Sequence, residues 1–265
     1  VPMLIKDGHQ VVTLRYRRQP ADAGVQCLRG DVTQPNFGIT EKLPPLDALV
    51  HCAGLVKFTE SQTLHLTNIH AVDNASQLAL KLGIPLFHVS TAYVAGDPNL
   101  GSVLAQDLQL GQQLRNAYER SKYEAEIHVR ATDGLEYCIV RPSVLVGDSK
   151  VVGIPPPMGF YLGVRGIQQA KAWLERKAGL PPLKPALQMP GNPLGTLNLI
   201  PVDLAARQLA DLVKANARGC YHLVNEHPPT VQEVMAAVSR VMEADIQIVP
   251  DLESNPAERL LVLLL

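Results

Sequence analysis

Short apolar runs alternate with helix-like stretches through the first half of the chain. The runs have the length of buried strands and are bounded by polar residues, glycine or proline. They span residues 11–14, 25–30, 46–52, 84–89 and 136–140. Residues 64–82 repeat apolar side chains at helical spacing and end at Gly83, a residue typical of helix C-termini. Strands that alternate with helices predict an α/β fold with a parallel sheet.

The second half of the chain shows a change in composition at residues 151–198, which are rich in proline. One apolar helix is expected at residues 160–177, and its larger side chains either line a channel or form ordinary core; they are Phe160, Tyr161, Leu162 and Trp173. After it, Asp203 is expected to cap a helix that runs to residue 213. We predict one domain of residues 1–150 plus 199–228, and a smaller lobe of residues 151–198 plus 229–265.

Composition and charge exclude several classes of protein. With 265 residues, 46% of them hydrophobic, and a net charge of -1, the chain is expected to bury an ample core. The balanced charge gives no excess of basic residues that would indicate nucleic-acid binding. The sequence shows neither an apolar run of membrane-spanning length nor a signal peptide. The cysteines have no metal-binding spacing, so we expect free thiols in the cytoplasm and no bound metal; they are Cys27, Cys52, Cys138 and Cys220.

A candidate catalytic pair lies in the helix predicted from residue 116 onward. Tyr118 and Lys122 are four residues apart, so they project from the same face of a helix. A phenol loses its proton at a pH of about 10, and an ammonium group nearby lowers that pKa. Tyr118 can then act as a general acid or base near neutral pH. The same spacing also occurs by chance on helix surfaces, so the pair needs further support.

That support comes from the apolar run at residues 84–89, which ends in Ser90 and Thr91 before a break at Gly96. Hydroxyl groups at this point lie at the carboxyl edge of a parallel sheet, where open α/β sheets bind ligands. Thr91 is therefore a candidate to hydrogen bond a substrate carbonyl opposite Tyr118. The alternative is a threonine that only caps the end of the strand.

The motifs together resemble a known family. A Ser/Thr at the end of the fifth strand, followed by Tyr, three residues and Lys, is the active-site pattern of the extended short-chain dehydrogenase/reductases. Residues 88–94, 118–122, 140–150 and 197–203 look most like the fatty acyl-CoA reductases and the thioester reductase, or male sterility, domains. The resemblance implies a Rossmann-type doubly wound parallel sheet that binds NAD(P), with a small substrate-binding lobe. It also implies that Asn68, early in the helix at residues 64–82, supports the active-site network.

The expected cofactor is NADPH, with NAD as the other option. Arginine at the end of the second strand accommodates the 2'-phosphate of NADP, whereas a carboxylate selects NAD, and Arg17 and Arg18 occupy this position. A solvated basic turn is the alternative. The small residues Cys52, Ala53 and Gly54 let backbone approach the cofactor closely.

The resemblance assigns further contacts to the cofactor. It places Asp31 and Val32 beside the adenine ring, although Asp31 also suits an Asx turn. It places the backbone of Pro142, Ser143 and Val144 beside the nicotinamide ring, and Tyr118 and Lys122 at the nicotinamide ribose.

One expected feature is missing from the sequence. The first strand and glycine-rich turn of this fold should precede Val1, so we expect that the sequence begins late in the fold. The apolar end at residues 260–265 similarly suggests a C-terminal lobe that is cut short.

The predicted function is the NADPH-dependent reduction of an acyl thioester or carbonyl substrate, with Thr91, Tyr118 and Lys122 as the active site. The alternatives are a nucleotide-sugar epimerase or dehydratase that retains NAD, a hydroxysteroid-type dehydrogenase, and a non-catalytic Rossmann module. The expected partner is a small molecule. The oligomeric state stays open, with a homodimer among the options.

Overall fold

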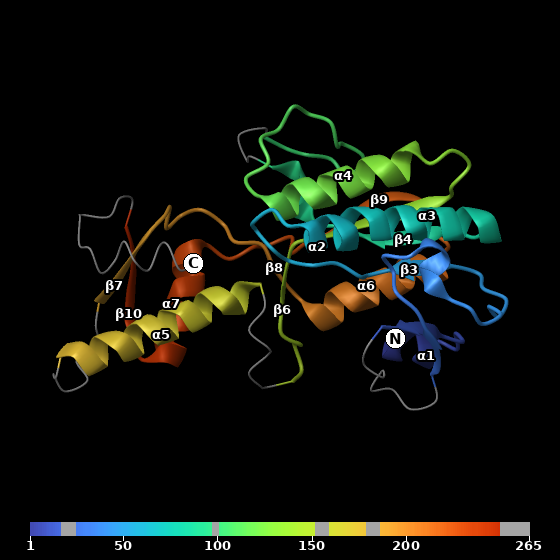
Figure 1. Cartoon of the computed structure of the whole chain (residues 1–265). Helices are drawn as coiled ribbons and strands as arrows, with labels where there is room; N and C mark the ends of the chain where they lie inside the picture. Colours follow the sequence, from blue (N-terminus) through green and yellow to red (C-terminus); the bar gives the residue numbers. More distant parts are fainter. Residues whose placement is uncertain (17–24, 97–100, 152–158, 179–185, 250–265) are drawn as a thin grey trace. The chain divides into compact units, whose positions relative to one another are not determined.

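The computed structural model describes residues 1–16, 25–96, 101–151, 159–178 and 186–249. The chain divides into two compact units (Figure 1). The first comprises Val1–Ser143 and Leu204–Leu223, and the second comprises Val144–Asp203 and Val224–Leu265. Each unit has its own parallel strands and its own buried apolar cluster.

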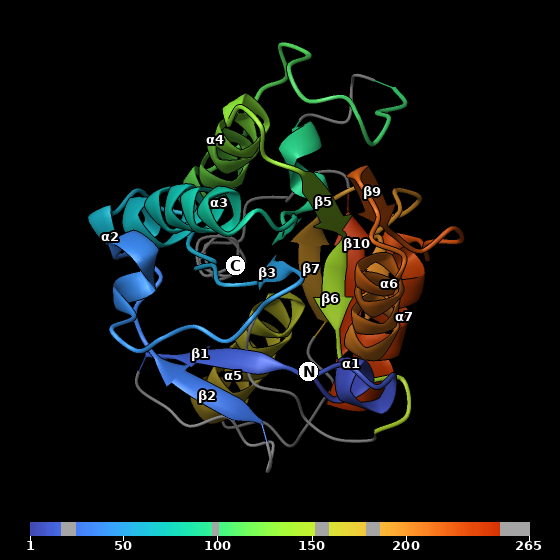
Figure 2. The same ribbon diagram turned by 90° about the vertical axis from the view of Figure 1, so that its right-hand side faces the viewer.

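The first unit is built on a four-stranded parallel sheet with the order β3-β4-β5-β9. Its strands are β3 (Leu49–His51), β4 (Leu86–Val89), β5 (Tyr137–Pro142) and β9 (Gly219–Leu223). A separate parallel pair consists of β1 (Val12–Arg15) and β2 (Gln26–Arg29), and Figure 2 shows this pair beside the larger sheet. In the doubly wound order 3-2-1-4-5-6, β1 and β2 take the places of strands 2 and 3. The strands β3, β4, β5 and β9 take the places of strands 4 onward. Within the described residues, no strand takes the place of strand 1.

Helices α3 and α4 lie together on one face of the four-stranded sheet, and α6 lies on the other (Figures 1 and 2). The helical elements of this unit are α1 (Pro2–Lys6), η1 (Pro35–Gly38), α2 (Gln62–His65), η2 (Leu66–His70), α3 (Ala71–Leu82), η3 (Ala92–Ala95), α4 (Ala117–Ala131) and α6 (Val202–Lys214), whose first two residues belong to the second unit. The predicted helix at residues 64–82 is thus present, but η2 interrupts it with a π-helical turn. It ends at Gly83, whose φ of +64° is a left-handed conformation that favours glycine.

The main core lies between the sheet and these two helices. Leu86 of β4 and Ile139 of β5 are fully buried in one cluster with Val72 of α3 and Val129 of α4. Burying an aliphatic side chain of this kind contributes about 1.5–3 kcal/mol. This packing fixes α4 on the sheet, and α4 carries the candidate catalytic pair.

The second unit contains two parallel strand pairs and two helices. The pairs are β6 (Val144–Val146) with β8 (Leu199–Pro201), and β7 (Ala186–Pro190) with β10 (Asp245–Val249). Helix α7 (Val231–Met242) begins with a capping box between Thr230 and Glu233. Helix α5 (Phe160–Ala178) contributes Ile167 to a small core, and Phe160 packs against that core.

Side-chain contacts show how Asp203 and Tyr161, two residues singled out from the sequence, are used in this unit. Asp203 lies inside the first turn of α6 rather than at its cap, and its carboxylate accepts hydrogen bonds from the Ser149 amide at 2.9 Å and the Ser149 hydroxyl at 2.6 Å. The Tyr161 hydroxyl accepts a hydrogen bond from the Gly147 amide at 2.9 Å.

Throughout the described part of the chain, no helix combines the length and apolar character that a membrane crossing requires.

Candidate active site

Thr91 lies where β4 ends and η3 begins. Its backbone is still extended, with φ of -154°, and its hydroxyl accepts a hydrogen bond from the Tyr93 amide at 3.3 Å. The preceding residue, Ser90, continues the sheet through its amide, which donates to the Val140 carbonyl at 2.7 Å. The carboxyl edge of β4 therefore carries the predicted hydroxyl pair.

The N-terminus of α4 sets the position of Tyr118. Asn116 caps the helix, because its side-chain oxygen accepts a hydrogen bond from the Glu119 amide at 2.9 Å. The Ala117 amide donates to the Phe58 carbonyl at 3.2 Å, which ties the loop after β3 to the same helix end. The Phe58 ring meets the Tyr118 ring edge-on, with 6.5 Å between the centroids. Tyr118 is thus held in the first turn of α4.

The structure brings the side chains of Thr91 and Tyr118 close together. Burial raises the pKa of the Tyr118 phenol, and the interaction with the Thr91 hydroxyl opposes this increase. The expectation that Lys122 lowers this pKa is wrong for the free protein, because the desolvation of Tyr118 dominates. Tyr118 is therefore a protonated phenol, the form that can donate a proton.

Lys122 is buried, with 3% of the residue exposed. Its ammonium nitrogen donates to the Val89 carbonyl at 2.7 Å and lies 3.4 Å from Nε2 of His88. Burial lowers the pKa of Lys122 to about 8, and the negative charges of Glu126 and ionised Cys52 oppose this shift. The Lys122 ammonium is thus held at the end of β4, one helical turn after Tyr118.

Asn68 connects three parts of the site. It lies in the π-helical turn η2 and is fully buried. Its side-chain oxygen accepts from the Leu55 amide at 2.7 Å, and its nitrogen donates to the Leu55 carbonyl and to Ser121 Oγ, both at 2.9 Å. Ser121 in turn donates to the Tyr118 carbonyl at 2.8 Å. π-Helical turns are frequent at functional sites, and this one aims Asn68 at the active-site helix.

The loop after β3 is open to a ligand at the residues predicted to approach the cofactor. Cys52 and Gly54 are exposed, and Ala53 is half-buried. A Cβ added at Gly54 would meet no atom nearer than Asn68 Oδ1 at 3.7 Å, so the space over this backbone is free. These small residues fit a dinucleotide that lies along the edge of the sheet.

The other predicted cofactor residues are partly engaged within the protein. Asp31 forms the Asx turn that was the alternative interpretation, because its Oδ1 accepts from the amide and hydroxyl of Thr33 at 2.9 and 2.8 Å. The Val32 carbonyl accepts from Asn74 at 3.0 Å. Arg17 and Arg18 lie outside the described residues.

The residues predicted to lie beside the nicotinamide differ in what they offer. Pro142 is buried at the end of β5. The amides of Ser143 and Val144 already donate to the Leu223 and Asn198 carbonyls at 3.0 and 3.2 Å, so they are not free donors. In contrast, Ser143 Oγ is buried and has no hydrogen-bond partner among the described groups. The hydroxyl rather than these amides is available to a ligand.

Sequence comparison identifies the family. A family model described as "Male sterility protein" matches residues 8–209, which is most of the chain. This chain belongs to the male sterility protein family.

Two further comparisons agree with this assignment. The chain is 30% identical over 225 residues to the hybrid PKS-NRPS synthetase pvhA of Talaromyces variabilis, a match that covers 79% of this chain but 5% of that much longer protein. The terminal R domain of the myxalamid PKS-NRPS pathway has a TM-score of 0.70 and 20% identity, over 94% of this chain and 68% of that one. The enzyme WbmG of Bordetella bronchiseptica, solved with NAD and UDP, has a TM-score of 0.60 and 17% identity, over 97% and 79% of the two chains.

The predictions of an α/β Rossmann-type fold and of a short-chain dehydrogenase/reductase enzyme are therefore confirmed. The matching family model and the folds of the solved structures agree with the predicted class of NAD(P)-dependent enzymes.

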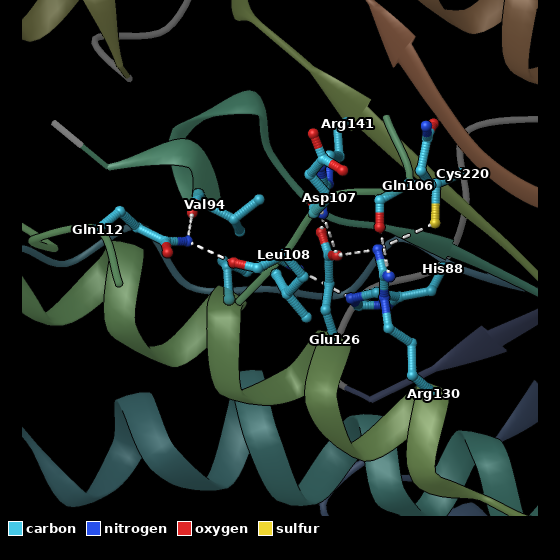
Figure 3. Close-up of polar contacts among 11 residues, drawn as sticks. His88, Val94, Gln106, Asp107, Leu108, Gln112, Glu126, Arg130, Arg141 and Cys220 are labelled. Atoms are coloured by element: carbon cyan, nitrogen blue, oxygen red, sulfur yellow. Dashed lines mark hydrogen bonds and ion pairs between the residues drawn. The ribbon is translucent and has the colours of Figure 1, made fainter. Parts of the chain in front are cut away.

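Sequence reasoning missed a buried ionic network in this male sterility protein (Figure 3). Glu126, one turn after Lys122, is fully buried and accepts from Nε and Nη2 of Arg141 at 2.9 and 2.8 Å. Arg130 lies 3.4 Å from the same carboxylate and donates to Cys220 Sγ at 3.1 Å. The signal in the sequence was an arginine within an apolar strand, which requires a buried partner.

The same network fastens the segment that precedes α4. Arg141 and Arg130 donate to the carbonyls of Asp107 and Gln106, each at 2.8 Å. Gln112 donates to the Val94 carbonyl at 2.8 Å and to the Leu108 carbonyl (Figure 3). Residues 106–112, which precede α4, are therefore held at several points. Among the described residues, no cluster of His, Cys, Asp or Glu has the arrangement of a metal site.

Proposed function

We propose that this chain reduces an acyl thioester to an aldehyde with NADPH, and that Thr91, Tyr118 and Lys122 form its active site. The observation that carries the proposal is the close pair of Thr91 and Tyr118 side chains, which lies at the carboxyl edge of β4 with a buried lysine one helical turn away. Two hydroxyl groups that point at the same place are suited to bind one carbonyl oxygen.

The protein groups then act on the oxygen and its proton. Thr91 and Tyr118 polarise the substrate carbonyl by hydrogen bonding to its oxygen. The bound NADPH would supply a hydride for the carbonyl carbon. Tyr118, whose pKa is raised by burial, transfers its proton to the oxygen as the new C–H bond forms. The product is a hemithioacetal, in which breakage of the C–S bond releases a thiol and an aldehyde.

The residues that would hold the cofactor follow from the geometry of the edge. The exposed backbone at Gly54 and the partnerless Ser143 hydroxyl support a contact with it, and we assign the contact with the ribose to the Lys122 ammonium. We assign NADPH rather than NAD on the strength of Arg17 and Arg18, whose positive charge suits a 2'-phosphate. The WbmG structure holds NAD, so this preference needs a direct test.

The substrate side is inferred from the loop after β3. Phe58 touches the Tyr118 ring and is 56% exposed, and the nearby Val56 is 49% exposed. Both are apolar and open to solvent, and Phe58 lies against the Tyr118 ring. This favours a substrate with an apolar group next to its carbonyl, such as an acyl chain.

The test is a reductase assay on the full chain with a panel of acyl-CoA thioesters, measured with NADPH and with NADH. We expect aldehyde, trapped as its hydrazone, and faster turnover with NADPH. Tyr118→Phe should lower kcat by about 10²–10⁴-fold, the usual contribution of a general acid. Tyr93→Phe is the matched control, because it keeps the ring beneath Arg115 and removes only a neighbouring hydroxyl. Full activity of Tyr118→Phe, or a panel in which no thioester is reduced, would overturn the proposal.

A further inference from the structure

Two buried histidines lie side by side next to the candidate active site. His51 at the end of β3 and His88 in β4 are register partners across the parallel sheet. Their ring centroids are 5.6 Å apart, and the residues are 3% and 0% exposed. Histidine is seldom buried in this way without hydrogen bonds. Yet both ring nitrogens of His51 and Nδ1 of His88 have no partner among the described groups.

Among the described groups, only Nε2 of His88 has a hydrogen-bond partner out of the four ring nitrogens, and that partner is Lys122. Nε2 of His88 lies 3.4 Å from the Lys122 ammonium nitrogen, which also donates to the Val89 carbonyl at 2.7 Å. An ammonium group has three N–H donors and no acceptor, so Nε2 must be the acceptor. The ring proton of a neutral His88 is then on Nδ1. The contact thus fixes both the tautomer of His88 and the direction of the hydrogen bond.

The surroundings keep both rings neutral. Burial is the main cause that lowers the pKa of His88 well below its usual value, and the charge of Lys122 adds to it. The same two causes lower the pKa of His51 to about 3. The other titratable groups that act on Lys122 are Glu126 on its own helix and Cys52 at the end of β3. A neutral acceptor therefore faces the lysine throughout the pH range in which enzymes of this class work.

We propose that His88 is a positioning residue for the reductase reaction: its neutral imidazole accepts a hydrogen bond from Lys122 and, with the Val89 carbonyl, holds the ammonium group in place for catalysis. The inference rests on the proposed function, because Lys122 matters for turnover only if the Thr91–Tyr118–Lys122 site is the active one. Two fixed acceptors direct two of the three N–H groups into the protein, which leaves the third for the ligand side. His51 contacts the His88 ring, and within the described part of the chain its ring nitrogens form no hydrogen bond with Lys122, so it does not hold the ammonium group.

The consequence is a pH dependence that His88 controls. Activity that needs the Lys122 ammonium is lost as the pH rises through the pKa of that group, which is about 8 in the free protein. His88→Leu removes one acceptor from the ammonium, so Lys122 loses its proton at a lower pH. A hydrogen bond to a charged group corresponds to a displacement of about one to two pH units. His88→Gln replaces the acceptor with an amide oxygen and should restore the alkaline limb to within a few tenths of a pH unit.

The first experiment compares the kcat–pH profiles of the wild type, His88→Leu, His88→Gln and His51→Leu in the full chain. His51→Leu is the matched control, because it removes the neighbouring buried imidazole from the same sheet. We expect the alkaline limb to move to lower pH in His88→Leu only. An equal displacement in His51→Leu, or none in His88→Leu, would show that His88 has a merely structural role.

The second experiment needs neither cofactor nor activity. The full chain is labelled with nitrogen-15 in its histidine rings, and the His88 signals are assigned as those absent from His88→Gln. We expect a neutral ring with its proton on Nδ1 from pH 6 to pH 9. An imidazolium at pH 6, or a proton on Nε2, would overturn the inference even if thioester reduction is confirmed. If the wild type reduces no thioester, the proposed function fails and the catalytic role of His88 fails with it, whatever the tautomer.

Discussion

Two neighbouring turns of α4 bury opposite charges, and the groups that surround the two charges differ. Lys122 and Glu126 are four residues apart, and they are 3% and 0% exposed. Glu126 is surrounded by arginine, with Arg141 at 2.8 Å and Arg130 at 3.4 Å. Lys122 has only a carbonyl and a neutral imidazole as hydrogen-bond partners among the described groups. Glu126 is held in place by ion pairs, whereas Lys122 is able to change its protonation state.

The contrast separates a structural charge from a chemical one. A buried carboxylate between two guanidinium groups pairs with both, and this geometry fastens α4 to β5 and to the segment before the helix. A buried ammonium with neutral partners keeps a lowered pKa, which is the property that proton chemistry near neutral pH needs. We expect substitutions at the two turns to have opposite effects on stability.

The largest effect is expected where the ion pair is broken. Glu126→Leu leaves the Arg141 guanidinium buried without its carboxylate, and Arg141→Leu leaves the Glu126 carboxylate without its closest partner. Each should lower the free energy of unfolding by about 3–5 kcal/mol, as measured by urea denaturation. The double variant should lose clearly less than the sum of the two, because neither charge is then stranded.

A surface ion pair provides the control for that measurement. Arg120 and Glu60 are 2.7 Å apart, but their side chains are 45% and 56% exposed. Arg120→Leu should therefore change the unfolding free energy by no more than about 1 kcal/mol. If Glu126→Leu is as mild as Arg120→Leu, the network does not have the structural role that we assign to it.

The sequence predicted the turn of α4 that carries Lys122, but not the ionic network at the turn that carries Glu126. The helix and the pair of Tyr118 and Lys122 follow from residue spacing, and Thr91 follows from an apolar run that ends in hydroxyls. The Glu126–Arg141 pair joins residues on a helix and a strand, so it depends on how these elements pack, and spacing along one element does not reveal it. The pKa of Tyr118 was predicted in the wrong direction because desolvation depends on the neighbours that the fold supplies. The π-helical turn at Asn68 leaves no periodicity signal in so short a segment.

An intermediate effect of the opposite sign is expected at Lys122. Lys122→Met removes an ammonium that is costly to bury, so the variant should be more stable than the wild type at pH 7 while its reductase activity is lost. The pKa of Lys122 is lowered from 10.5 to about 8, and 1.36 kcal/mol per pKa unit makes the gain ~3 kcal/mol at most.

The pH dependence of that gain identifies its cause. Between pH 8 and pH 10.5 the unfolded wild type binds the lysine proton and the folded wild type does not, so the stability of the folded wild type rises with pH. The advantage of Lys122→Met should therefore be full below pH 8 and shrink to nothing by about pH 10.5. Urea denaturation of both proteins at pH 7, 9 and 10.5 checks this. An advantage that stays constant with pH would mean better packing by methionine instead of relief of a buried charge.

The smallest effect is expected at Asn68, whose hydrogen bonds involve no charge. Asn68→Ala leaves the amide and carbonyl of Leu55 and the Ser121 hydroxyl without their partner, which should cost about 1–3 kcal/mol of unfolding free energy. The loss should be local, so hydrogen exchange at the Leu55 amide should become faster while the amides of β4 stay protected. Asn74→Ala, which removes one hydrogen bond to the Val32 carbonyl from the same helical segment, should leave exchange at Leu55 unchanged. If exchange at the Leu55 amide becomes equally fast in both variants, the loop after β3 is held by the packing of α3 as a whole. Asn68 then has no special part in joining that loop to the active-site helix.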